Sequence, residues 1–396
     1  MNFITGRYRR RTSRHNGAMV SGNSNSILSS LQCEIGTQCS ECGACQKTCT
    51  LLKQYGTPRS IAAFDFSSSQ KQTIAYECSL CGLCAAVCPE KLDPGRLFLE
   101  VRRLCVEEGN FDTSAYRKIL AYEKLGHSPL FSWYGLPEGC KTIFFPGCTL
   151  PGTRPAVTTE IYRQLQKIIP TAGLVLDCCS KPSHDLGRAE YFDGIFNEMN
   201  SYLTDMGITT VLTACPSCTK IFRKCGHGLE VRTVYEFIHT HIRNEENNNA
   251  APVTEKTITV HDPCPLRNDL PTQQAVRAML ADQGHNMVEM KHRGERTLCC
   301  GEGGMVGAIN PERAKEWAVF CSKEAEGHQI VSYCAGCTGF LNRVVPNVHV
   351  ADILFKPENN LDGNIKIARA PFTYWNRLRF KRSMKSEIRL RLTDPK

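Results

Sequence analysis

The residues with the clearest chemical potential are cysteines, which make up 23 of the 396 positions. Eight of them form two runs, CSECGACQKTC and CSLCGLCAAVC, and each run has two gaps of two residues followed by one of three. The runs supply Cys39, Cys42, Cys45 and Cys49, then Cys78, Cys81, Cys84 and Cys88. Thiolates are soft ligands for iron, and three at this spacing can bind one face of a cluster. The runs therefore predict two [4Fe–4S] clusters.

The fourth cysteine of each run is expected to bind the other cluster, as in ferredoxin-type pairs. This predicts one cluster on Cys39, Cys42, Cys45 and Cys88, and one on Cys78, Cys81, Cys84 and Cys49. Pro89 follows the second run, as the pattern prefers, whereas Thr50 follows the first. The alternative is zinc, because Cys-x-x-Cys pairs also suit that metal. Zinc would leave the repeated three-residue gap unexplained, so iron is the preferred interpretation.

A second cysteine pattern occurs twice in the rest of the chain: one Cys, an adjacent Cys–Cys pair, and a Cys-x-x-Cys pair. The first copy is Cys148, Cys178, Cys179, Cys215 and Cys218, and the second is Cys264, Cys299, Cys300, Cys334 and Cys337. Equivalent cysteines lie 116 to 121 positions apart, which indicates an internal duplication. A single adjacent pair could be a buried packing pair. Repetition in register favours metal ligands instead.

Short apolar segments alternate with helical stretches from residue 141 onward, and this pattern predicts α/β units. Segments such as KTIFFPGC (141–148) and KTITVHDPC (256–264) lead directly into the cysteines. Ligand sites in open α/β sheets form beyond the carboxyl ends of strands, so all ten cysteines are expected at strand ends. The glycine-rich run 301–307 does not fit a dinucleotide-binding turn. We expect it to give the backbone room beside a cluster.

The predicted organisation has seven segments. Residues 1–30 are basic, polar and expected to be disordered; 31–92 form a mainly helical, α+β dicluster ferredoxin-like domain; and 93–140 form a helical connector. Two tandem α/β domains cover 141–243 and 256–355, joined by a polar linker at 244–255, and 356–396 form a basic tail. In that tail Phe380, Met384 and Ile388 share a helix face, which suits contact with an anionic membrane or a membrane subunit. A solvated, partly ordered tail is the alternative.

Composition limits the remaining function classes. The formal net charge is +9, but the basic residues gather at the two ends of the chain, and bound clusters are anionic, so we do not expect nucleic acid as a partner. No apolar run of signal-peptide or membrane-span length follows the N-terminal arginines. Reduced, clustered thiols then indicate a cytoplasmic protein, either free or peripheral at the inner face of the cell membrane.

The duplicated pattern resembles the CCG domain of the heterodisulfide reductase family, and the resemblance covers roughly residues 39–350. That family includes heterodisulfide reductase B and D subunits and the iron–sulfur subunits of anaerobic glycerol-3-phosphate dehydrogenase, glycolate oxidase and lactate-utilisation systems. Gly301 matches the family pattern after the second pair, whereas Ser180 replaces that glycine after the first. The resemblance implies one or two further clusters, which in heterodisulfide reductases are non-cubane [4Fe–4S], held by the two five-cysteine sets. It also makes the second set, Cys264, Cys299, Cys300, Cys334 and Cys337, a candidate catalytic site.

The resemblance implies an oxidoreductase component that acts with a partner. No flavin, nicotinamide or haem motif is visible, so electrons are expected from a flavoprotein or another redox subunit, and the CCG sites are expected to reduce a disulfide or a quinone-linked acceptor. A pure electron conduit for a flavin dehydrogenase is one alternative, and a zinc-binding scaffold is another. Lys181, His184, His261 and Asp262 lie beside the cysteines and could deliver protons, although structural hydrogen bonding is the preferred interpretation.

Overall fold

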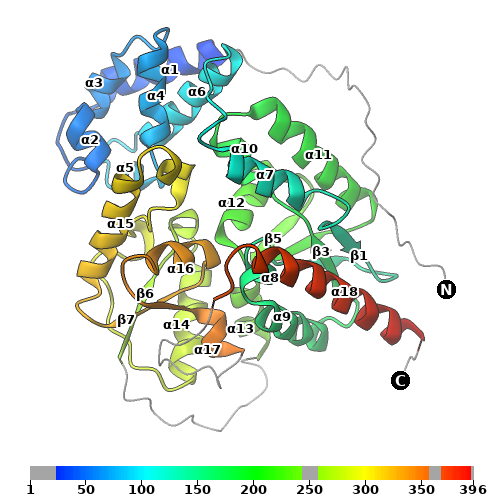
Figure 1. The fold of residues 1–396 in the computed structure, drawn as a ribbon. Coiled ribbons are helices and arrows are strands. Elements are labelled where there is room, and N and C mark those ends of the chain that lie inside the picture. The colour runs from blue at the N-terminus through cyan, green and yellow to red at the C-terminus, as the bar shows by residue number, and fades with distance from the viewer. Residues whose placement is uncertain (1–23, 243–256, 356–366, 394–396) are drawn as a thin grey trace.

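The computed structural model describes residues 24–242, 257–355 and 367–393. Its N-terminal part is helical, as Figure 1 shows in blue and cyan, and packs on top of two α/β domains. The elements of this part are α1 (Ser24–Gln38), α2 (Thr50–Tyr55), α3 (Pro58–Ala62), α4 (Ser69–Ile74), η1 (Ala75–Glu77), α5 (Leu83–Ala86) and α6 (Pro94–Glu107). Local signals fix α6, because Pro94 occupies its first turn and the Asp93 carboxylate accepts a hydrogen bond from the Arg96 N–H.

The expectation of disorder up to residue 30 is wrong from Ser24 onward, where α1 begins. Leu28 and Leu31 of α1 lie in one hydrophobic cluster with Leu97 and Val101 of α6. Burying such a side chain contributes about 1.5–3 kcal/mol, so tertiary packing stabilises a helix whose composition is mostly polar. Residues 1–23 of that prediction lie outside the described residues.

The first α/β domain follows α7 (Arg117–Gly126) and contains a five-stranded sheet in the order β1-β3-β2-β4-β5. The strands are β1 (Trp133–Gly135), β2 (Thr142–Phe145), β3 (Gly173–Leu176), β4 (Thr210–Thr213) and β5 (Glu230–Thr233). β1 is antiparallel to β3 and the other pairs are parallel. The helices are α8 (Leu150–Thr153), α9 (Pro155–Ile168), α10 (Lys181–Asp185), α11 (Ala189–Asp205), α12 (Pro216–Cys225) and α13 (Val234–Ile242). Helices cover both faces of the sheet, which explains the continuous apolar runs of β2 and β4.

The second α/β domain has a parallel three-stranded sheet, β6-β7-β8, whose strands are β6 (Ile258–His261), β7 (Gln329–Ser332) and β8 (Asn347–His349). Its other elements are η2 (Cys264–Leu266), α14 (Leu270–Asp282), η3 (Gly294–Arg296), η4 (Gly303–Ala308), α15 (Pro311–Glu324), α16 (Ala335–Leu341) and α17 (Val350–Leu354). The order β6-β7-β8 repeats β2-β4-β5 of the first domain. The sheets therefore carry the duplication seen in the cysteines.

The expectation that all ten duplicated cysteines follow strands is wrong for Cys299 and Cys300. In the first domain the equivalent pair follows β3, which is parallel to β2. In the second domain the counterpart of β3 is reduced to one parallel bridge between Ile258 and Met287, and a short helical turn, η3, precedes the pair. A loop held by tertiary contacts therefore positions these two thiols.

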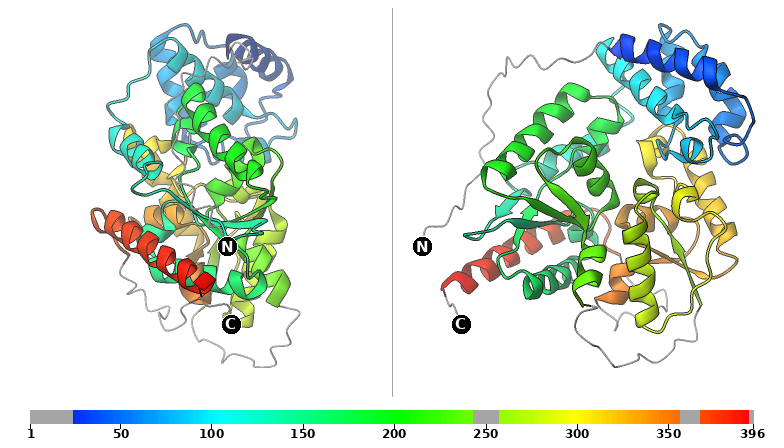
Figure 2. Two further views of the ribbon diagram at one scale, coloured as in Figure 1. Left: turned by 90° about the vertical axis from the view of Figure 1, so that its right-hand side faces the viewer. Right: turned by 180° about the vertical axis from the view of Figure 1, so that it is seen from behind.

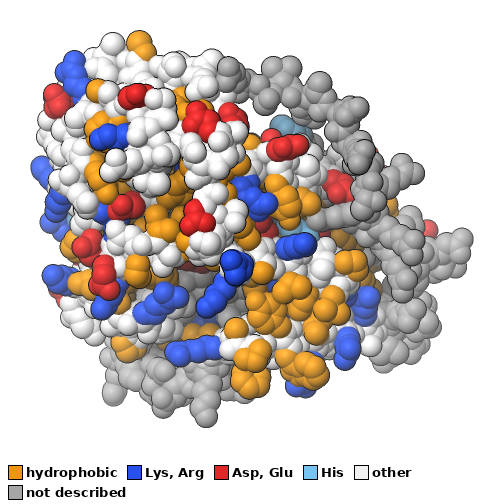
Figure 3. Space-filling view, turned by 45° about the horizontal axis from the view of Figure 1, so that its top comes forward, with side chains coloured by type: hydrophobic (Ala, Val, Ile, Leu, Met, Phe, Trp, Pro, Cys, Tyr) orange, Lys and Arg blue, Asp and Glu red, His pale blue; other side chains and the backbone are white. Residues whose placement is uncertain are grey.

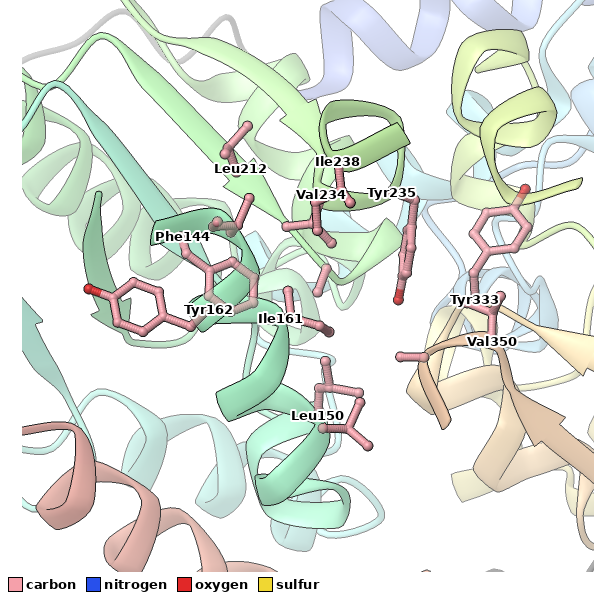
Figure 4. Packing of buried hydrophobic residues seen from close by; sticks show 14 of the residues in the cluster. Phe144, Leu150, Ile161, Tyr162, Leu212, Val234, Tyr235, Ile238, Tyr333 and Val350 are labelled. Atoms are coloured by element: carbon pink, nitrogen blue, oxygen red, sulfur yellow. The ribbon is translucent and has the colours of Figure 1, made fainter. Parts of the chain in front are cut away.

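The two α/β domains share one hydrophobic core. Figure 4 shows Tyr235, in the first turn of α13, beside Tyr333 of the second domain, and their ring centroids are 6.2 Å apart. Both residues belong to a cluster that includes Phe144 from the first domain and Val350 from the second. The linker predicted at 244–255 lies outside the described residues. The shared core holds the two domains in one fixed relation.

The C-terminal segment is a helix, α18 (Phe372–Thr393), packed along the first domain beside α8 and α9, as both views of Figure 2 show. The expectation that its apolar face is free for a membrane is wrong, because Phe380, Met384 and Ile388 are buried in the shared core. Phe372 and Trp375 at its start are exposed, and Figure 3 shows hydrophobic and basic side chains mixed on one face of the molecule. Within the described ranges, no helix has the length and apolar character needed to cross a bilayer.

Candidate metal centre

The first ferredoxin-type group lies in the loop between α1 and α2 and is completed by Cys88. The Cys45 thiol interacts electrostatically with those of Cys39, Cys42 and Cys88. These four residues line one cavity together with Cys84, and Cys42 is the exposed member. The structure thus gathers the four cysteines that the crossed assignment predicts for one cluster, and their role as ligands stays a prediction.

The second group collects cysteines from the second run and Cys49, which caps α2. The Cys84 thiol interacts with those of Cys78, Cys81 and Cys49. Two arginines accompany this group: Arg102 donates to the backbone carbonyl of Cys78, and Arg267 donates to that of Cys81 at 2.8 Å. The guanidinium groups place positive charge where thiolates are expected.

The first five-cysteine group sits at the carboxyl ends of β2, β3 and β4. Hydrogen bonds link the thiols of Cys148 and Cys178, of Cys179 and Cys218, and of Cys215 and Cys218. Cys215 caps α12 and Cys218 lies in its first turn, so the Cys-x-x-Cys spacing turns both sulfurs to one side.

Ser180 follows the Cys178–Cys179 pair at the position where the second domain has Gly301. Its backbone is left-handed, with φ of 55°, as the backbone of Gly301 is in the second domain. The Ser180 hydroxyl is 2.8 Å from Nε2 of His127, whose Nδ1 is 2.7 Å from the Asp177 carboxylate. A Ser–His–Asp arrangement can activate a nucleophile, but Ser180 is fully buried, so we assign the network to holding the strained backbone beside Cys179. Sequence reasoning missed both His127 and Asp177, although Asp177 directly precedes the Cys178–Cys179 pair.

Arg377 of α18 is a third missed residue of this group. Its side chain is buried, its guanidinium lies 4.8 Å from the Phe131 ring, and its Nη1 has no hydrogen-bond partner among the described residues. Hydrogen bonding from Cys178 lowers the pKa of Cys148 to about 6, and Arg377 adds to that shift. Nothing in the sequence connects position 377 to Cys148. Only the packing of α18 reveals it.

The second five-cysteine group combines η2, the Cys299–Cys300 loop and α16. Hydrogen bonds link Cys299 to Cys264 and Cys300, and Cys337 to Cys300 and Cys334. The neighbouring Asp262, considered above as a proton donor, is instead bound by Arg277 at 2.9 Å and by the Tyr333 hydroxyl at 2.8 Å. In the first domain Lys181 is likewise ion-paired with Asp185. Both residues therefore have structural partners.

The four groups approach one another in a fixed order. The thiols of Cys81 and Cys299 are hydrogen-bonded, so the second ferredoxin-type group touches the second five-cysteine group. Side chains at Gly303 or Gly304 would collide with backbone atoms of Ser79 and Cys78, and their absence permits this approach. The thiols of Cys334 and Cys215 interact electrostatically, so the two five-cysteine groups lie within electrostatic range of each other.

The electrostatics of these groups fit a metal cofactor. Burial raises the pKa of Cys45 to about 11 and that of Cys78 to about 12. Burial likewise raises the pKa of Cys84 well above its ordinary value. Thiolates in such surroundings are unfavourable unless a cation accompanies them, and iron in a cluster supplies that charge.

Comparison with known proteins identifies the domains that carry these cysteine groups. The family described as a 4Fe-4S dicluster domain matches residues 38–93, and the family described as a cysteine-rich domain, CCG, matches residues 142–223 and 258–342. The D subunit of dihydromethanophenazine:CoB–CoM heterodisulfide reductase from Methanosarcina barkeri is 28% identical over 58% of this chain and 62% of its own length. Its Methanosarcina mazei counterpart is 28% identical over 45% of this chain and 47% of its own.

A probable membrane-anchored ferredoxin from Chromohalobacter salexigens is 34% identical over 24% of this chain and 15% of its own length. The chain thus spans about half to three fifths of the reductase D subunits and a small part of that ferredoxin. The matched regions confirm the predicted fold class, a ferredoxin-type dicluster domain followed by two CCG domains. The chain therefore belongs to the iron–sulfur proteins that combine these domains and is related to the D subunit of heterodisulfide reductase.

Proposed function

We propose that this chain is an electron-transferring oxidoreductase subunit in which all eighteen motif cysteines bind clusters and the second CCG site reduces a disulfide or a quinone-linked acceptor. When bound, the clusters would accept and release single electrons. The observation that carries the proposal is the order of the four cysteine groups. The thiols of Cys81 and Cys299 are in contact, and those of Cys334 and Cys215 interact electrostatically, so the second ferredoxin-type group lies beside the two five-cysteine groups.

The residues around the groups support this role. Arg102 and Arg267 neutralise charge beside the second ferredoxin-type group, and their hydrogen bonds to backbone carbonyls fix its position. Cys264 retains partial solvent access, whereas Cys299 and Cys300 are buried, so a small incoming thiol could reach this group from solvent. A flavoprotein or another redox subunit would act as the donor at the ferredoxin-type end, in the cytoplasm or at the inner face of the membrane.

The test is a titration of the oxidised, anaerobically purified full chain with low-molecular-weight thiols, followed by EPR. A new signal that Cys300→Ala abolishes and Cys179→Ala retains supports substrate binding at the second CCG site. Cys179 is the matched control because it holds the equivalent position in the first domain. No response to any thiol, together with rapid reduction by a flavoprotein, would favour a pure electron conduit.

A further inference from the structure

Glu302 lies at the second CCG site and no function has yet been given to it. A carboxylate oxygen of Glu302 and the Sγ atoms of Cys300 and Cys337 all lie within 4.8 Å of one another, and Glu302 is the exposed member of the three. The residue belongs to the loop after the Cys299–Cys300 pair, and Cys337 belongs to the first turn of α16. Two thiolates and one carboxylate from two elements thus converge on one point, and all three are ligand types that iron accepts.

No partner within the described residues explains this placement. The Glu302 carboxylate makes neither a hydrogen bond nor an ion pair with any described residue. The ammonium of Lys181 acts on it from a distance, but that ammonium is ion-paired with Asp185. A carboxylate among thiolates is unfavourable unless a cation lies between them.

The duplication provides an internal comparison. Glu302 occupies the position that Lys181 holds in the first domain, two residues after the second cysteine of the adjacent pair. Gly336 similarly corresponds to Ser217, within the Cys-x-x-Cys motif. A Cβ atom on Gly336 would collide with the Glu302 carboxylate. Gly336 has helical backbone within α16, so its missing side chain serves the carboxylate and not the backbone.

We propose that Glu302 is a sixth protein ligand of the second CCG site and binds an iron through a carboxylate oxygen beside Cys300 and Cys337. The proposal rests on the proposed function, because it requires that site to hold an iron–sulfur cluster. It makes the two CCG sites unequal, since Lys181 cannot serve as an anionic ligand in the first. A hard oxygen ligand on iron is more easily replaced by sulfur than a thiolate is, so Glu302 would mark the iron that an incoming sulfur reaches.

The test is Mössbauer spectroscopy of the anaerobically purified full chain loaded with ⁵⁷Fe, comparing wild type with E302Q. We expect the difference spectrum to contain the component of a single oxygen-ligated iron, about one in 16 if all four sites hold [4Fe–4S] clusters. The matched K181Q variant should give no such difference. G336A should reproduce the loss, because the new methyl group displaces the carboxylate while leaving the glutamate in the chain.

Identical spectra for wild type and E302Q at equal iron content would overturn the proposal, as would an equal change in K181Q. If E302Q fails to fold or to load iron, G336A decides, since only the flexible end of the Glu302 side chain has to move in it. Wild-type protein that binds no iron would overturn the proposed function itself. That result is distinct from iron-loaded protein with an unchanged spectrum, which overturns the role of Glu302 alone.

Discussion

Arg102 offers a direct test of how the cysteine groups are held in order. Its side chain is fully buried on α6, and its guanidinium donates to backbone carbonyls from all three folded parts. The acceptors are Ala75 at 2.9 Å and Cys78 in the ferredoxin-type domain, Asp185 at 2.7 Å in the first CCG domain, and Gly304 at 3.1 Å in the second. One side chain therefore stabilises the junction where these parts meet.

Arg102→Met keeps most of the side-chain volume but leaves the buried carbonyls without a donor. Each unsatisfied buried group costs about 1–3 kcal/mol, and partial relaxation reduces the sum, so we expect a loss of about 3–5 kcal/mol in the free energy of unfolding. Arg103→Met is the control. Arg103 is adjacent but partly exposed, and among the described residues its ion pair is with Glu100, so its replacement should cost clearly less than that of Arg102.

The assay is urea unfolding of the iron-loaded full chain under anaerobic conditions, followed by far-UV circular dichroism. We also expect the signal of the second ferredoxin-type cluster to change in Arg102→Met, since Arg102 contacts the Cys78 backbone. A loss below about 1 kcal/mol in Arg102→Met, or an equal loss in Arg103→Met, would refute the assignment of this arginine as the link between the domains.

Three other predictions concern the core, the crossed ligands and pH. Phe380→Ala should lower the free energy of unfolding by about 3–5 kcal/mol because it opens a cavity under α18. Trp375 is 58% exposed, so Trp375→Ala should change that free energy by less than about 1 kcal/mol in the same urea titration. Cys49→Ser should remove the EPR signal of the second ferredoxin-type cluster and Cys88→Ser that of the first; the reverse assignment would show that the fourth cysteines do not cross. Burial and the nearby Arg154 hold the pKa of His349 well below its usual range. As the pH falls, His349 is therefore protonated in the unfolded chain while it stays neutral in the folded chain. Stability should therefore fall as pH drops below about 6.5, by up to about 1.4 kcal/mol per pH unit, and His349→Asn should flatten that slope in thermal unfolding measured from pH 7 to 5.

The cysteine groups could be predicted from the sequence because their geometry is local. A Cys-x-x-Cys spacing turns two sulfurs to one side whatever surrounds it, and the duplication pairs the rest. The gathering of Cys148 with Cys178 and Cys215 needed only the general rule about strand ends. Cys299 and Cys300 lie in the same kind of site, although the strand expected before them is reduced to a single β-bridge.

The contacts between groups could not be predicted, because they depend on how distant segments pack. The Cys81–Cys299 contact joins positions more than 200 residues apart, and Arg377 reaches Cys148 only because α18 returns to the first domain. Phe380, Met384 and Ile388 share one face of α18, as their spacing predicts, but periodicity does not say what covers such a face. Here the protein's own core covers it.

We propose that the chain holds iron–sulfur clusters at all four cysteine groups, and metal and sulfide analysis of the anaerobically purified full chain would decide this. We predict about 16 irons and a similar amount of acid-labile sulfide per chain, with no zinc. Protein that is loaded with zinc and free of iron would contradict this claim. A count near eight irons, with both ferredoxin-type signals present, would contradict it for the two CCG sites.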